Sequence, residues 1–296
     1  METRKFKQVD VFTDRPFFGN PVAVVLNADG IDAEEMQRIA AWANLSETTF
    51  VLPPEAPGAD YRLRIFTPAA ELPFAGHPTI GSAHAALEAG IVPGGTRDWR
   101  QECGAGIVPI RVEDDGGGRL IFARAPKAKF VRDFSASIDA LSEALGTRVS
   151  AEPPPASVDN GPVHLFVRLA SATAVRELRP DMAALLRLSR DFSVTTVAVF
   201  ALLEGAAEAV HIRCFAPVAG IAEDPVTGSA NAALPAYLAH YGLLDRVGRR
   251  YVARQGEELG RAGRVHIRVL DDEGRAEFGG RAITVIEGEI ALRDSA

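Results

Sequence analysis

The chain has 296 residues, of which 47% are hydrophobic, and it carries a formal net charge of −7 at pH 7. This length exceeds the size at which single hydrophobic cores usually divide, so we expect two domains. The acidic balance and the absence of a basic run argue against nucleic acid and membrane partners, and two cysteines indicate a reducing compartment without a disulfide framework.

The N-terminal sequence enters an alternating strand pattern and does not contain the apolar core of a signal peptide. No run approaches the roughly 20 apolar residues that a membrane-spanning helix needs. We therefore expect a soluble, cytoplasmic protein.

In the first half, alternating and β-branched residues predict strands at 7–12, 22–26, 48–52, 62–66, 107–112 and 120–123. A helix is expected after Asp32, a suitable N-cap that precedes apolar residues at helical spacing. A second helix is expected at 83–89, with Gly90 as its stop.

In the second half, the segment 126–130 is the best linker, so the domains are predicted to span 1–126 and 127–296. The expected helices are 136–145 and 230–241, the latter kinked by Pro235, and the expected strands are 163–169, 194–203, 210–215 and 265–269. A last strand at about 282–294 can pair with either domain. Together these elements predict an α+β protein.

Two segments of the chain recur. In one-letter code, RIFTP (64–68) and HPTIGSAHAAL (77–87) return as RCFAP (213–217) and DPVTGSANAAL (224–234). The copies agree at proline, glycine and serine, but the second segment begins with His77 in one copy and with Asp224 in the other. The pattern predicts an internal duplication whose chemistry lies at these two positions.

In both copies a Pro-x-x-Gly-Ser turn precedes small helical residues, which predicts helix N-termini at Gly81-Ser82 and Gly228-Ser229. Unpaired N–H groups and the positive end of the helix dipole favour an anion there, so two such ends could hold one carboxylate. A single turn of this kind is usually only a helix cap. The duplication favours His77 and Asp224 as an acid/base or substrate-binding pair.

Five motifs together resemble the phenazine-biosynthesis PhzF family over nearly the whole chain. They are GNP (19–21), SETTFV (46–51), RIFTP (64–68), ELPFAGHPT (71–79) and EDPVTGSAN (223–231). The resemblance implies a fold like that of diaminopimelate epimerase. In this fold, two similar α+β domains each wrap a sheet around a central helix, and the active site lies in the cleft between them.

The resemblance also implies proton-transfer chemistry without a cofactor. The glutamate of the SETTFV motif, Glu47, corresponds to the acid/base, and His77 and Asp224 would polarise the substrate or assist the proton shuttle. The candidate substrate-binding positions are Gly228, Ser229, Asn20 and Gly76.

Racemases of this fold use two thiols at two helix ends, but His77 and Asp224 occupy those positions here. Cys103 leads into a predicted strand and Cys214 lies inside one, so a two-thiol mechanism is not expected. Motifs for nucleotide cofactors and for zinc are absent from the sequence, so neither a cofactor nor a metal is expected.

The leading interpretation is therefore an isomerase that shifts a proton on a small carboxylate-bearing substrate, for which a ring is one option. Amino-acid epimerase or racemase activity is one alternative, and a family member that binds without catalysis is another. A homodimer is the expected assembly.

Overall fold

The computed structural model describes residues 2–93, 95–203 and 208–292. Its contacts divide the chain into two units, which are described separately. Unit 1 comprises Met1–Arg124 and Gly279–Ala296, and unit 2 comprises Ala125–Phe278. Among the described residues, no helix is both long enough and apolar enough to span a bilayer.

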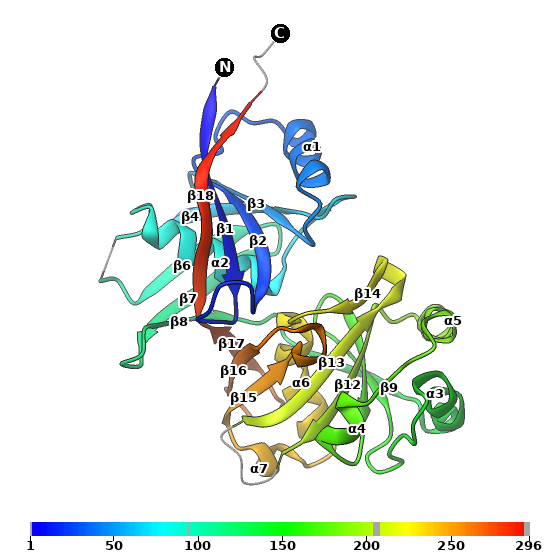
Figure 1. The fold of residues 1–296 in the computed structure, drawn as a ribbon. Coiled ribbons are helices and arrows are strands. Elements are labelled where there is room, and N and C mark those ends of the chain that lie inside the picture. The colour runs from blue at the N-terminus through cyan, green and yellow to red at the C-terminus, as the bar shows by residue number, and fades with distance from the viewer. Residues whose placement is uncertain (1, 94, 204–207, 293–296) are drawn as a thin grey trace. The chain divides into compact units, whose positions relative to one another are not determined.

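The described residues of unit 1 form a mixed sheet and the helices α1 and α2 (Figure 1). The strands are β1 (Thr3–Val11), β2 (Asn20–Val25), β3 (Thr48–Leu52), β4 (Tyr61–Phe66), β5 (Glu71–Leu72), β6 (Asp98–Cys103), β7 (Gly106–Asp114), β8 (Arg119–Arg124) and β18 (Ala282–Ala291), and the helices are α1 (Ala33–Ala43) and α2 (Gly76–Glu88). The strands pair in the order β18-β1-β2-β3-β4-β6-β7-β8, with β5 also paired to β4. Of these pairings between described strands, β2–β3 and β4–β6 are parallel.

The sheet of unit 1 wraps around α2, which contacts β1, β2, β3, β4, β8 and β18. Ten of the 13 residues of α2 are buried, because the helix is apolar or small-sided around its whole circumference. Gly81 allows the closest approach: a Cβ atom there would lie 2.4 Å from Cγ1 of Val22. The predicted arrangement of a sheet around a central helix is thus confirmed for this unit.

Unit 2 repeats the architecture. Its strands are β9 (Lys129–Asp133), β10 (Ala156–Asp159), β11 (Val163–Arg168), β12 (Thr196–Leu202), β13 (Glu208–Ala216), β14 (Ile221–Asp224), β15 (Arg250–Gln255), β16 (Gly263–Val269) and β17 (Ala276–Gly280), and its helices are α3 (Ile138–Leu145), α4 (Ala172–Arg176), α5 (Met182–Phe192), α6 (Gly228–His240) and α7 (Leu244–Val247). The order β9-β10-β11-β12-β13-β15-β16, with β14 on β13, matches β18-β1-β2-β3-β4-β6-β7 of unit 1 pair for pair, and β11–β12 and β13–β15 are parallel. The helix α6, also with ten of 13 residues buried, occupies the place of α2.

The duplication extends to side chains on the repeated strands. Arg64 donates Nε and Nη2 to the two carboxylate oxygens of Glu71, each at 2.7 Å. In unit 2, Arg213 binds Glu223 in the same way, at 2.8 and 2.7 Å. Each guanidinium also lies 5.1 Å from the ring centroid of the phenylalanine two residues later. The two units therefore share a local charge pair as well as a topology.

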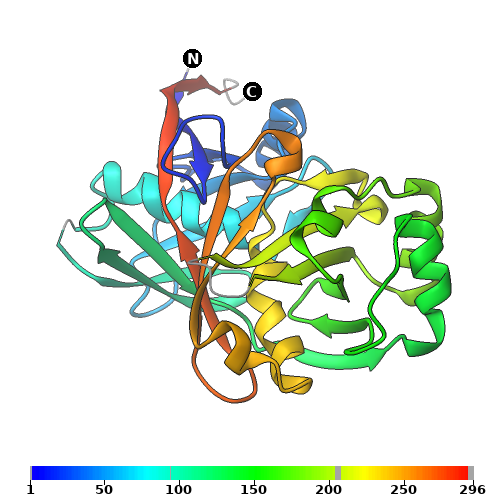
Figure 2. The same ribbon diagram turned by 60° about the horizontal axis from the view of Figure 1, so that its bottom comes forward.

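The C-terminal strand belongs to unit 1. Thr3 of β1 lies opposite Ala291 of β18 in a long antiparallel pairing, and the two strands run side by side in both views (Figures 1 and 2). The division at 127–296 is corrected accordingly: the contacts place the boundary after Arg124 and return Gly279–Ala296 to the first unit. The strand was expected to reach 294, but residues 293 and 294 lie outside the described residues.

The start of α2 also differs from the prediction. The helix begins at Gly76, so Gly81 and Ser82 lie in its interior and form no N-terminal turn. Proline is compatible with a first helical turn, where its missing N–H has no intrahelical partner, and Pro78 occupies that turn. In unit 2, α6 begins at Gly228 as predicted and continues through Pro235 to His240.

Candidate active site

The first group of candidate residues lies at one edge of the sheet of unit 1. Because β2 and β3 are parallel, with Ala23 opposite Thr48, the residues that begin these strands meet at the same edge. Glu47 directly precedes β3, and His77 lies in the first turn of α2. Oε2 of Glu47 and Nε2 of His77 are 3.3 Å apart. The structure thus brings together two residues that the sequence separates by a strand and a hairpin.

The environment of His77 determines its protonation. Its side chain is 7% exposed and that of Glu47 is 16% exposed. Burial lowers the pKa of His77 to about 3, although a hydrogen bond to the backbone of Pro21 acts in the opposite direction. Proline has no N–H, so the carbonyl of Pro21 accepts and the histidine donates. Since Nε2 makes no hydrogen bond, Nδ1 is the donor, and Nε2 presents its lone pair.

Two other predicted residues line the same edge. Asn20 opens β2 and is 1% exposed, and Gly76 is the buried first residue of α2. The residue before it, Ala75, provides no side-chain cap for the helix. The first-turn amides of α2 therefore receive no side-chain acceptor from their own N-cap, which suits a carboxylate ligand.

The second group lies at the start of α6 in unit 2. Asp224 ends β14, and its Oδ2 accepts a hydrogen bond of 2.6 Å from Oγ1 of Thr227, the N-cap residue of the helix. Gly228 and Ser229 follow in the first turn, and the carbonyl of Ser229 accepts from Nδ2 of Asn160 at 2.9 Å. The structure thus gathers Asp224, Gly228 and Ser229 at one helix N-terminus.

Gln255 holds this turn together, and the sequence interpretation missed it. Its Nε2 donates to the carbonyl of Asp224 and to Oγ1 of Thr227, both at 3.0 Å. Its Oε1 accepts from the backbone N–H of Thr227 and from Nδ2 of Asn231, again at 3.0 Å. The available signal was a glutamine on the buried face of a strand in which Tyr251 and Ala253 are the other buried residues.

The first Gly-Ser pair does not belong to a ligand site. Ser82 is fully buried in α2, and its hydroxyl lies 2.8 Å from Oγ1 of Thr49. Gly81 packs against Val22, as described above. The prediction of an anion-binding turn at Gly81-Ser82 is therefore wrong, because the helix already begins five residues earlier, at Gly76.

The cysteines have structural surroundings. Cys103 ends β6 beside the turn into β7, and burial raises the pKa of its thiol. Cys214 is fully buried in β13, where burial also raises the pKa of the thiol. Neither thiol lies at a helix start. Within the ranges that the structure describes, no three His, Cys, Asp or Glu side chains cluster as metal ligands would.

The duplicated fold is that of the diaminopimelate epimerase-like proteins. A solved hydroxyproline epimerase from Agrobacterium vitis covers 99% of the chain, and 93% of that structure is matched, at a TM-score of 0.67 and 15% identity, which shows likeness of fold. A Bacillus anthracis protein described as a phenazine biosynthesis protein of the PhzF family superimposes with a TM-score of 0.87 at 29% identity, covering 99% of this chain and all of that one.

The model of the PhzC-PhzF family, described as phenazine biosynthesis-like protein, matches residues 9–288, and the chain belongs to this family. Antisense-enhancing sequence 1 of Schizosaccharomyces pombe is 38% identical over 98% of this chain and 99% of its own length. Trans-2,3-dihydro-3-hydroxyanthranilate isomerase of Pseudomonas aeruginosa is 37% identical over 96% of this chain and 94% of its own. The chain is accordingly an isomerase of the PhzF type.

Proposed function

We propose that this isomerase moves a proton between two atoms of a small carboxylate-bearing substrate, with Glu47 as the general acid and base. The observation that carries the proposal is the contact between Oε2 of Glu47 and Nε2 of His77, at 3.3 Å in a largely buried setting. Proton transfer by a positioned side chain typically contributes about 10²–10⁴-fold to the rate.

The hydrogen bond from Nδ1 of His77 to Pro21 leaves a lone pair on Nε2 that faces the carboxyl group. That contact is attractive only when a single proton lies between the two atoms. Glu47 can then deliver this proton to one substrate atom and recover a proton from another. No net proton is consumed, as an isomerisation requires.

The residues at the helix starts orient the substrate in this proposal. The first-turn amides at Gly228 and Ser229 bind the substrate carboxylate, and Asn20 and Gly76 contribute further contacts. A helix dipole adds about 0.3–1 kcal/mol to such binding, so it positions an anion and does not drive the chemistry. Asp224 polarises the substrate or assists the proton shuttle.

The name of the Pseudomonas aeruginosa relative supports a cyclic substrate of the dihydro-hydroxyanthranilate kind. Cys103 is half-buried at a strand end and Cys214 is buried within a strand, and these positions favour this chemistry over a two-thiol racemase. Independence from cofactors, a homodimer and a cytoplasmic location remain predictions.

The test is exchange of carbon-bound hydrogen in D₂O, followed by NMR. Trans-2,3-dihydro-3-hydroxyanthranilate is the first substrate, followed by other cyclic carboxylates and by amino acids. We expect exchange with at least one cyclic carboxylate and its loss in Glu47→Gln. Silence with the whole panel would overturn the proposal and favour a binding protein, and exchange confined to amino acids would favour an epimerase.

A further inference from the structure

Unit 2 contains a second candidate site, a hollow of about 920 Å³ lined by residues from the loop after α4, from β13 and β14, and from the turn after β15. It includes none of Asp224, Gly228 and Ser229. Glu223 lines it, and successive side chains of a strand point to opposite faces, so the neighbouring Asp224 faces away from it. The hollow is therefore separate from the start of α6.

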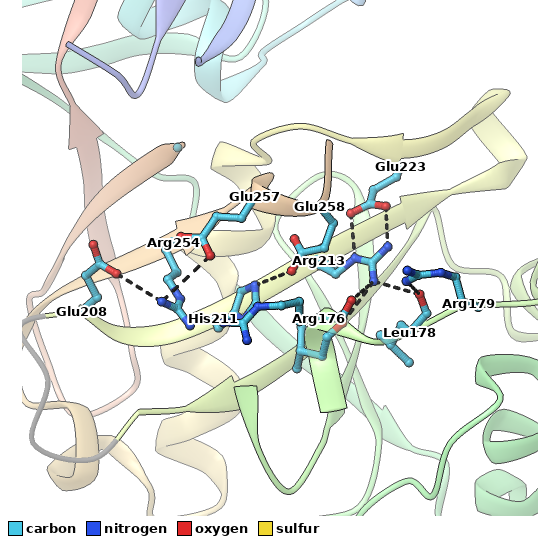
Figure 3. Close-up of polar contacts among 12 residues, drawn as sticks. Arg176, Leu178, Arg179, Glu208, His211, Arg213, Glu223, Arg254, Glu257 and Glu258 are labelled. Carbon is cyan, nitrogen blue, oxygen red and sulfur yellow. Dashed lines mark hydrogen bonds and ion pairs between the residues drawn. The ribbon is translucent and has the colours of Figure 1, made fainter. Parts of the chain in front are cut away.

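In one wall of the hollow, the guanidinium group of Arg213 already has hydrogen-bond partners within the protein. Arg213 places Nε and Nη2 on Glu223, and its Nη1 donates to the carbonyls of Val175 and Leu178, each at 3.1 Å (Figure 3). This guanidinium ties the end of α4 to β14 and carries no spare charge. It forms part of the frame of the hollow and is not available to a ligand.

The carboxylate of Glu258, by contrast, lacks such hydrogen-bond partners among the described residues. Its side chain is 7% exposed, and its Oε1 lies 3.0 Å from Nε2 of the fully buried His211 (Figure 3). Burial opposes ionisation, but the contact with His211 and the charge of Arg213 hold the pKa of the Glu258 carboxyl below its ordinary value. Within the described chain, Oε2 has no hydrogen-bond partner. A buried carboxylate oxygen left in this state is costly, and a cationic N–H donor would relieve the cost.

Two arginine side chains, whose charge is opposite to that of Glu258, line the same hollow. Arg176 and Arg179 are exposed, and among the residues that the structure describes no carboxylate forms an ion pair with either. Arg179 uses one N–H, Nη1, on the carbonyl of Leu178. The remaining donors of both side chains are suited to a carboxylate, which arginine binds through paired N–H groups.

Apolar side chains complete the lining. Phe215 and Leu178 are 1% and 2% exposed, and Leu259 at the rim is 44% exposed. The hollow thus has a carboxylate and guanidinium groups with unused hydrogen-bonding atoms. The exposed Leu259 beside them offers contact area to an apolar group of a ligand.

We propose that this hollow binds an α-amino acid with an apolar side chain in its zwitterionic form. The ammonium group of the ligand donates a hydrogen bond to Oε2 of Glu258, and its carboxylate accepts from Arg176 and Arg179. Its side chain packs against Leu259 and Phe215. The site does not depend on the proposed proton-transfer function, since it shares none of its residues.

Calorimetric titration of the unmodified protein tests the charge pattern. L-Leucine should bind, whereas N-acetyl-L-leucine, which lacks the ammonium group, and L-leucinamide, which lacks the carboxylate, should bind at least about tenfold more weakly. Glycine should also bind more weakly, because it has no side chain. If L-leucine does not bind, or if either derivative binds as tightly, the proposal is overturned.

The matched variants are Glu258→Gln and Glu257→Gln on the same turn. The carboxylate of Glu257 is paired with Arg264 at 3.3 Å, so Glu257→Gln should leave the affinity for leucine nearly unchanged. Glu258→Gln should reduce that affinity by at least about tenfold. Equal losses in the two variants would contradict the proposal, and if Glu258→Gln fails to fold, the ligand series on the unmodified protein still decides. Glu47→Gln should bind leucine normally even though it loses proton exchange, which separates the two sites.

Discussion

The two central helices arise from the same sequence motif but begin at different points in it. Gly76, the first residue of α2, precedes His77 by one position, whereas Gly228, the first residue of α6, follows Asp224 by four. His77 therefore lies inside a first helical turn against Glu47, and Asp224 lies on a strand end against Thr227. The same motif thus yields a titratable pair in unit 1 and a hydrogen-bonded helix start in unit 2.

A buried glutamine from a neighbouring strand fixes the motif in each unit, but it holds a different part. In unit 1, Gln101 accepts from the hydroxyl of Tyr61 at 2.9 Å and donates to Oγ1 of Thr79, inside the helix, at 3.2 Å. In unit 2, Gln255 binds both the backbone N–H and the hydroxyl of the N-cap residue Thr227. The comparison teaches that the same residue type on equivalent strands meets the motif at different points, inside the helix in unit 1 and at the N-cap in unit 2.

The largest difference between the units is expected in turnover, when Glu47 of unit 1 is replaced. Glu47→Gln preserves the shape of the side chain but cannot exchange a proton with His77, so turnover should fall by about 10²–10⁴-fold with little change in melting temperature. The measurement is kcat with the exchanging substrate, and Glu71→Gln on the exposed pair with Arg64 is the control. A variant that keeps more than about a tenth of the rate would remove Glu47 from the mechanism.

The second effect concerns the two glutamines. Gln255→Leu removes four hydrogen bonds and takes away the acceptor of the buried backbone N–H of Thr227, which should cost about 2–4 kcal/mol of unfolding free energy. Gln101→Leu removes two and should cost about half as much. Urea unfolding of both variants measures the difference. Equal losses of unfolding free energy would show that the two strands support the motif equally, and would contradict the difference inferred between the units.

A third effect, shared by the units, is a dependence of stability on pH. Burial lowers the pKa of both His77 and His164 to about 3 from an ordinary 6.5. Between these values the unfolded chain binds protons that the folded chain does not, so the unfolding free energy should fall as the pH decreases from 6.5 toward 3. Each histidine contributes up to about 1.4 kcal/mol per pH unit.

Urea titrations at several pH values measure this slope. His164→Asn and His77→Asn should each flatten it, and only His77→Asn should also reduce turnover. An unchanged slope in His77→Asn would mean that this histidine is already protonated in the fold, against the tautomer inferred from Pro21.

The smallest effect is expected at the thiols. Cys103→Ala and Cys214→Ala should leave turnover within a few-fold of the unmodified enzyme, with a modest loss of stability at the fully buried Cys214. Treatment with a chelator should likewise have no effect on turnover. Rapid inactivation on alkylation of Cys103 would revive thiol chemistry, and loss of activity with a chelator would contradict a cofactor-free mechanism.

The sequence by itself determined the duplication, the α+β class and the start of α6, as well as local features such as the N-cap at Asp32, which accepts from the N–H of Glu35 at 2.8 Å. These features are encoded within a few residues by turn chemistry, capping and periodicity, so they can be read without a partner segment.

The tertiary structure alone decided which distant groups meet. Parallel pairing of β2 and β3 and the packing of α2 bring Glu47 to His77, pairing with β1 assigns β18 to unit 1, and a separate strand delivers Gln255 to Asp224. Periodicity reports which face of an element is buried but not which element covers that face. For that reason the sequence could name the residues of the two helix starts, and only packing could show that these residues have different partners.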